Sequence, residues 1–177
     1  MTFSSAILLI LLVGVATFFI IIYNRLVALQ NNVKKSYANI SVLLEQRHDE
    51  LPKLIESCKQ YMTFESQTLT DVMVARGKVY EANQSGNVKA LGLAEGALRN
   101  GLGSLLAVSE KYPDLKANED FQRLIARISE LESDIADRRE YYNNCVNLNN
   151  VRMQEFPNNL VVGIFGFELA HMLDFKS

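Results

Sequence analysis

Charge is absent from the first 24 residues of this 177-residue chain, although charged side chains make up 21% of the sequence. Tryptophan is missing, and only three prolines, two cysteines and nine glycines occur. So little proline and glycine excludes a collagen-like or low-complexity chain, and 49% hydrophobic residues exclude a disordered one. The net charge of −2 provides no basic field over the whole chain, so we expect no nucleic-acid partner.

The uncharged start contains an apolar run over residues 6–23, AILLILLVGVATFFIIIY. As an α-helix it would extend about 27 Å, close to the thickness of the hydrocarbon core of a bilayer. A cleaved signal peptide would have a basic start and a small-residue cleavage site, and both are missing. We therefore expect an uncleaved transmembrane helix that includes Ala6, Leu12 and Phe18 and has Tyr23 at the membrane interface.

The charges that follow the run predict its orientation. Arg25, Lys34 and Lys35 precede the first acidic residue, Glu45. Basic residues accumulate on the cytoplasmic side of a membrane span. The sequence therefore predicts a short external tail at 1–5 and a cytoplasmic location for everything after residue 23.

Beyond residue 24 the apolar residues recur at steps of three and four, which is typical of amphipathic helices, and strand-type alternation is missing. The predicted fold class is all-α: an N-terminal transmembrane helix followed by an antiparallel up-down-up-down four-helix bundle over 24–156. The expected helices cover 24–47, 50–83, 87–112 and 118–156. Cys58 and Cys145 fall on apolar stripes, so we expect core residues rather than a disulfide or a zinc site.

Pro52 leaves two alternatives open. It would either kink one long helix or lie in the first turn of a new helix capped by Asp49. A single helix of about 60 residues would extend about 90 Å and outrun its partners. We therefore expect a break or a tight reversal near His48.

A second proline marks a turn between two helices. Tyr112 precedes Pro113, and a residue before proline avoids the helical region. We expect one helix to end there, a turn that begins at Asp114 and runs to residue 117, and a new helix capped by Asn118.

The third proline, Pro157, follows Phe156 and closes the last helix of the bundle. The remaining segment, 157–177, is too apolar to be a free linker. It packs either across the base of the bundle or in the membrane interface. We expect Phe156, Pro157, Phe165 and Phe167 to be membrane-proximal.

Both histidines occur in Glu-x-x-His spacing, at Glu45–His48 and Glu168–His171. In four-helix carboxylate proteins, such pairs help to hold two iron or manganese ions. A predicted helix end at His48 and a tail location for His171 do not favour one shared site. No phosphate loop or nucleophile–base pattern occurs either, so we expect no enzymatic activity, no catalytic residue, no metal and no cofactor.

Four glycines lie in one predicted helix, at Gly92, Gly96, Gly101 and Gly103. Each costs a helix about 0.8–1 kcal/mol relative to alanine, so a close backbone approach is the expected compensation. That approach occurs either inside the bundle or between subunits, where these glycines would form a self-association face.

Two groups of polar residues leave further alternatives open. The cluster around Arg138, Arg139 and Asn143 either places Tyr142 in the core with the arginines paired to acidic neighbours, or forms a partner-binding patch. Arg76 stands where the apolar series expects a hydrophobic residue, as a paired core charge or as an edge residue.

Several long segments resemble the LemA family. They are Tyr23-Asn24, VKKSYANISVLLEQRHDELPKLIESCKQY at 33–61, SEKYPDLKANEDF at 109–121 and FPNNLVVGIFGF at 156–167. The resemblance implies a single-pass protein of the bacterial inner membrane with a short outer N-terminus and a cytoplasmic antiparallel four-helix bundle. The family has no established enzymatic activity, and relatives in magnetotactic bacteria are associated with building an internal membrane organelle. It usually carries an aromatic residue at position 48 and lacks His171.

These features predict a non-enzymatic, membrane-anchored scaffold. Its expected partners are the lipid bilayer, further copies of itself and other membrane proteins, with self-association raised by confinement to two dimensions. The alternatives are a metal- or small-molecule-binding four-helix protein and an accessory subunit of a membrane protease or transporter.

Overall fold

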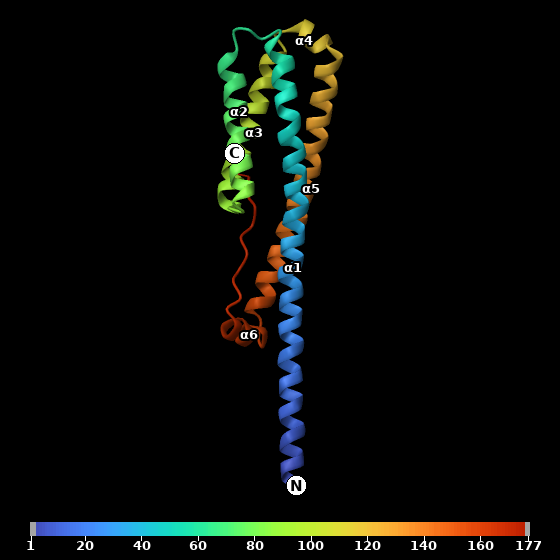
Figure 1. The fold of residues 1–177 in the computed structure, drawn as a ribbon, viewed down its shortest axis with the longest axis vertical. Coiled ribbons are helices and arrows are strands. Elements are labelled where there is room, and N and C mark those ends of the chain that lie inside the picture. The colour runs from blue at the N-terminus through green and yellow to red at the C-terminus, as the bar shows by residue number, and fades with distance from the viewer. Residues whose placement is uncertain (1–2, 176–177) are drawn as a thin grey trace. The chain divides into compact units, whose positions relative to one another are not determined.

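The computed structural model describes residues 3–175, and within them it contains six helices and no strand. The helices are α1 (Phe3–Lys59), α2 (Ser66–Gln84), α3 (Val88–Ser109), α4 (Pro113–Ala117), α5 (Glu119–Gln154) and α6 (Asn158–Phe165) (Figure 1). The all-α prediction is therefore confirmed. Residues 1–2 of the predicted external tail and the side chain of Ala6 lie outside what is described.

The described chain forms two compact units. Unit 1 comprises residues 3–36 and 144–170, which include the apolar part of α1, the end of α5 and α6. Unit 2 comprises residues 37–143 and 171–175, which include the rest of α1, all of α2 to α4 and most of α5.

The N-terminal part of α1 is a candidate membrane span. Its most apolar window of 18 residues has a mean hydropathy of 3.0, and only 6% of that window is buried. Leu12 and Phe18 are among the large apolar side chains that it exposes. Such a surface suits the hydrocarbon core of a bilayer, and the predicted span over 6–23 lies entirely within α1.

The helix α1 continues through Pro52, so the predicted break near His48 is wrong. Proline has no N–H, and this leaves the carbonyl group of the residue four positions earlier, His48, without its helical partner. A side chain of α2 supplies the missing donor, because Arg76 Nε lies 2.8 Å from the His48 carbonyl oxygen. Arg76 is therefore a partly buried charge that is hydrogen-bonded to His48.

The chain reverses after Lys59 instead, and α2 begins at Ser66. The N–H groups of Tyr61 and Met62 both donate to the Cys58 carbonyl oxygen, at 3.0 and 2.8 Å, and so close the end of α1. The length argument for an earlier break assumed a helix that continues to residue 83, and the reversal after Lys59 prevents such a helix. Helix α1 belongs to both units. Only its residues 37–59 need partners in unit 2.

The later helices begin and end close to the predicted positions. Asn87 caps α3 by accepting from the Ala90 N–H at 3.0 Å, and Asn118 caps α5 by accepting from the Phe121 N–H at the same distance. The predicted turn over 114–117 is a short helix, α4. Its first residue is Pro113, whose fixed φ favours a helix start.

The core of unit 2 follows the helical period. In Figure 1, α2 and α3 lie side by side, joined by a turn in which Gly86 has a φ of 65°. Buried apolar side chains recur at steps of three and four on each long helix. They include Ile40, Leu44, Leu51, Leu54 and Cys58 of α1, Val72 and Val79 of α2, Leu91, Leu98 and Leu105 of α3, and Phe121, Ile128, Leu131 and Ile135 of α5.

A buried charge network interrupts this apolar core. Arg47 of α1 and Glu95 of α3 are both fully buried, and the Arg47 guanidinium bonds Glu95 and also Glu132 of α5. Arg99 Nε lies 3.2 Å from the second Glu132 oxygen. Burial raises the pKa of Glu95, and the neighbouring Arg47 charge opposes that rise. One guanidinium thus holds three helices together at a single level.

We expect the Arg47→Met variant to lower the free energy of unfolding of unit 2 by about 3–5 kcal/mol, because it leaves the Glu95 carboxylate buried without its partner. Urea unfolding of the full chain in detergent, followed by circular dichroism, measures the change. The Arg47→Met/Glu95→Leu variant should recover most of the loss. Arg127→Met, which removes an exposed pair, should change it by less than about 0.5 kcal/mol. A loss below about 1 kcal/mol for the first variant would contradict the network's role.

Candidate functional site

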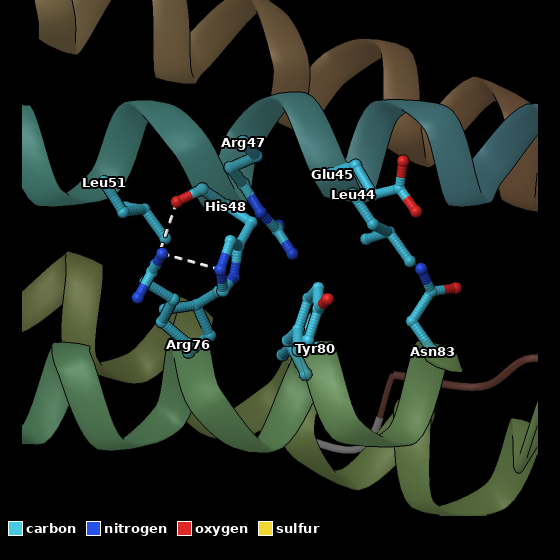
Figure 2. A pocket seen from close by; sticks show the side chains of 10 residues that line it. Leu44, Glu45, Arg47, His48, Leu51, Arg76, Tyr80 and Asn83 are labelled. Carbon is cyan, nitrogen blue, oxygen red and sulfur yellow. Dashed lines mark hydrogen bonds between the residues drawn. The ribbon is translucent and has the colours of Figure 1, made fainter. Parts of the chain in front are cut away.

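His48 lies in a small pocket between α1, α2 and α3 (Figure 2). Arg76 reaches it from α2, with Nη2 2.6 Å from His48 Nε2. The Tyr80 ring stacks on the imidazole with the ring centroids 4.6 Å apart. The cavity has a volume of ≈ 10 Å³, which is room for about one water molecule. It is too small to hold an organic substrate.

The contacts of His48 decide its protonation state. A guanidinium can only donate, so His48 Nε2 accepts and the neutral ring carries its proton on Nδ1. Nδ1 is buried and has no hydrogen-bond partner within residues 3–175. Burial lowers the pKa of His48, the charge of Arg76 lowers it further, and Asp49 and Glu45 act in the opposite direction. The site therefore holds a neutral histidine.

Within the described residues, no group of three His, Cys, Asp or Glu side chains is arranged to hold a metal ion. Glu45 and His48 line the same pocket in unit 2. Glu168 belongs to unit 1 and His171 to unit 2, so the second Glu-x-x-His pair is divided between the units. Cys58 is fully buried, and burial raises the pKa of its thiol to about 11, as suits a core residue.

The end of the chain binds unit 2 through its main chain. Asn143 Nδ2 donates to the Leu173 carbonyl oxygen at 3.1 Å, and Asn143 Oδ1 accepts from the Leu173 N–H at 2.8 Å. The Tyr142 hydroxyl donates to the His171 carbonyl oxygen at 2.8 Å. Leu173 is fully buried. Two side chains of α5 thus satisfy backbone groups that a helix or a sheet would otherwise pair.

Two further features accommodate this segment. A Cβ atom on Gly92 would collide with the Asp174 carbonyl oxygen, so glycine permits the close approach. The Phe175 ring lies against the guanidinium groups of Arg99 and Arg139, whose Cζ atoms are 4.9 and 4.5 Å from its centroid. Part of the predicted polar–aromatic cluster therefore holds the tail of the same chain.

The other three predicted glycines have different surroundings. A Cβ atom on Gly101 would lie 3.3 Å from Val72 Cγ2, so this glycine faces α2. Gly96 is buried, whereas Gly103 is exposed and would have open space around a Cβ atom. Close approach inside the chain thus accounts for Gly92 and Gly101, and the self-association face stays a prediction.

In unit 1, α6 packs against the end of the apolar part of α1. Ile22, Leu26, Met153 and Val161 form a buried cluster. The Tyr23 ring centroid lies 4.8 Å from that of Phe165 and 5.6 Å from that of Phe167. The Asn150 amide donates to and accepts from the Ala170 main chain, both at 2.9 Å. Phe156 and Pro157, by contrast, form the exposed or half-exposed connection from α5.

The residues of the predicted turn lie around α4. Tyr112, Pro113 and Asp114 are half-exposed or exposed, and the buried Leu115 anchors the short helix. Besides capping α5, Asn118 donates through Nδ2 to the Tyr61 hydroxyl at 3.2 Å. This motif therefore joins two helix connections of unit 2 and has a structural role.

The LemA family model matches residues 36–177, which is most of the chain. The chain belongs to the LemA family. This LemA protein is also similar to magnetosome proteins, at 24% identity to MamQ 1 and MamQ 2 of Paramagnetospirillum magneticum over 87% of its length. It is 23% identical to MamQ of Magnetospirillum gryphiswaldense over 89% of its length. The alignments cover 65% and 66% of those relatives, so the chain spans about two thirds of their length.

Some structurally important residues of this LemA protein were not predicted from sequence. Arg47 lies three residues after Leu44 and four residues before Leu51. Glu95 lies four residues after Leu91 and three residues before Leu98. Both charges thus occupy the apolar register, and that signal would have found them. Asn150 carries no comparable signal, because its partner is a main-chain group.

We expect acid to destabilise unit 2 through His48. Because the native state has the lower pKa and so binds the proton less tightly than the unfolded chain, the free energy of unfolding falls as the pH drops below 6.5, by up to about 1.4 kcal/mol per pH unit. Urea unfolding at a series of pH values from about 7.5 down to about 5 measures this. The His48→Phe variant should lack this part of the pH dependence. Identical pH profiles of the variant and the unchanged protein would contradict it.

We expect the Asn143→Leu variant to release the end of the chain, because both its bonds to Leu173 are lost, at a cost of about 1–3 kcal/mol. Hydrogen exchange of the Leu173 amide should become faster. The neighbouring Asn144 is exposed, so Asn144→Leu is the matched control and should leave the exchange unchanged. Equal exchange rates in the two variants would show that Asn143 does not hold the segment.

Proposed function

We propose that this LemA protein is a non-enzymatic scaffold of the bacterial inner membrane that self-associates and organises membrane or membrane proteins locally. Its N-terminus lies outside, and the helices after the span lie in the cytoplasm. This orientation is supported by three exposed basic residues that follow the span: Arg25, Lys34 and Lys35. The proposal is carried by one observation, the character of the exposed surface of α3.

Between Ala90 and Ser109, the one charged side chain of α3 that is partly exposed is Arg99, which pairs with Glu132, and the fully exposed residues are uncharged. They are Leu93, Ala97, Asn100, Gly103, Ser104, Leu106 and Ala107. Solvent-exposed helix faces are ordinarily rich in charged residues. Small and apolar residues allow two helices to approach closely, so this surface, the α3 face, suits contact with another helix. We propose that copies of the chain contact one another through the α3 face. Of the four glycines predicted for self-association, Gly103 is the exposed one and lies on this face.

Contacts within unit 2 support an antiparallel four-helix bundle as the cytoplasmic part. Arg47 links α1 to α3 and α5, and α2 packs against α3. Successive long helices joined by short connections become antiparallel neighbours. A rigid bundle would present the α3 face in a constant orientation relative to its own helices.

The membrane itself favours association. A span confines all copies to two dimensions and raises their effective concentration, so a modest contact area between helices suffices. The similarity to magnetosome proteins supports a role at membranes. Family membership supports the same role and does not point to a substrate.

Imaging of single full-length particles in native-lipid discs tests the proposal, and we expect symmetric assemblies of several copies. The Gly103→Leu variant should reduce them to smaller species, because leucine adds bulk to the α3 face. Gly77→Leu is the matched control, since Gly77 is a helical glycine of α2 that also has open space around it. Both substitutions raise helix propensity by a similar amount, about 0.8–1 kcal/mol, so neither weakens its helix. A monomer for the unchanged protein would overturn the scaffold, and intact assemblies of Gly103→Leu would overturn the α3 face.

A further inference from the structure

The helix α6 and its neighbours form an uncharged segment. Residues 156–167, FPNNLVVGIFGF, contain no charged side chain, and Glu155 and Glu168 flank them. On α6 only Val161 is buried. Ile164 is 70% exposed, Phe165 58% and Leu160 47%. Leu160 and Ile164 are four residues apart and share one side of the helix. Large apolar side chains gathered in this way on a surface mark a contact with a partner or a membrane.

The contacts of α6 place it at the end of the candidate span. Val161 packs with Ile22 and Leu26, which are the last turn of the apolar run and the turn after it. The Tyr23 ring contacts Phe165 and Phe167. Tyrosine at the end of a span lies at the level of the lipid headgroups. The exposed Arg25 follows two residues later and suits the phosphate groups there.

We propose that α6 is a second membrane-contact element, an interfacial foot that lies in the headgroup region with Leu160, Ile164 and Phe165 directed into the boundary of the acyl chains. This rests on the proposed transmembrane span of α1. The occupant of the surface is lipid, because α6 is bound to the span within unit 1 at the level where the bilayer ends. Each chain thus holds the membrane by a span and by a foot.

The absence of tryptophan from the chain provides a direct test. Three single substitutions of the same kind introduce one fluorophore each: Phe165→Trp in the foot, Phe18→Trp in the span and Phe64→Trp between α1 and α2. Phe64 belongs to unit 2 and is 93% exposed, so it is the matched control outside the membrane. The full-length variants are reconstituted in phosphatidylcholine–phosphatidylglycerol vesicles, with and without bromine on the acyl chains near the headgroup.

We expect brominated lipid to quench the emission of Phe165→Trp and Phe18→Trp and to leave that of Phe64→Trp unchanged. The emission of Phe165→Trp should also shift to the blue relative to Phe64→Trp. Because Phe165 contacts Tyr23, Ile164→Trp serves as a second reporter that keeps this contact and should be quenched in the same way.

The outcomes separate the foot from the span. Quenching of Phe18→Trp without quenching of Phe165→Trp and Ile164→Trp would overturn the foot and retain the span. A blue-shifted but unquenched emission from the two foot reporters would mean that protein, such as a second copy, covers α6, and would overturn the assignment to lipid. Loss of quenching at Phe18→Trp itself would overturn the span, and with it the proposed membrane scaffold.

Discussion

The hydrogen bond from Arg76 to the His48 carbonyl oxygen allows α1 to continue past Pro52. Pro52 leaves the His48 carbonyl group unpaired, and Arg76 of α2 donates to it at 2.8 Å. The same guanidinium bonds the His48 ring, so the compensation for the proline and the packing of α2 on α1 are a single arrangement. Because α1 does not stop there, it reaches Lys59 before the chain turns, and that turn decides which residues of α2 and α3 meet it.

The buried network of Arg47, Glu95 and Glu132 influences how the helices are aligned along one another rather than how long they are. Leucine-rich helices can slide past one another by a turn with little change in apolar burial. Arg47 restricts this, because its guanidinium meets Glu95 and Glu132 from two other helices only in one register. Such networks add little net stability over a well-packed apolar core. We expect the Arg47 network to act instead by excluding alternative registers of these helices. The network thus complements the apolar stripes.

The sequence predicted what depends on periodicity and composition. The apolar run, the all-α class and the cap by Asn118 follow from local patterns, and the structure has all three. The break at Pro52 was predicted wrongly because its compensation comes from a residue 24 positions further along the chain, which no local pattern contains. The tail contacts of Asn143 were missed for a related reason. A side-chain amide that binds main-chain groups leaves no signature in the side chains of the segment that it holds.

Main-chain hydrogen bonds hold residues 171–175 in unit 2, and this affects which sequence changes the segment can accept during evolution. Asn143 and Tyr142 bind main-chain N–H and C=O groups, which every amino acid except proline possesses, so most substitutions in the segment leave these bonds intact. Length is another matter. Leu173 is buried while Met172 and Asp174 on either side are exposed, so deleting one residue upstream would exchange an inward side chain for an outward one. The segment should therefore tolerate most substitutions but not insertions or deletions.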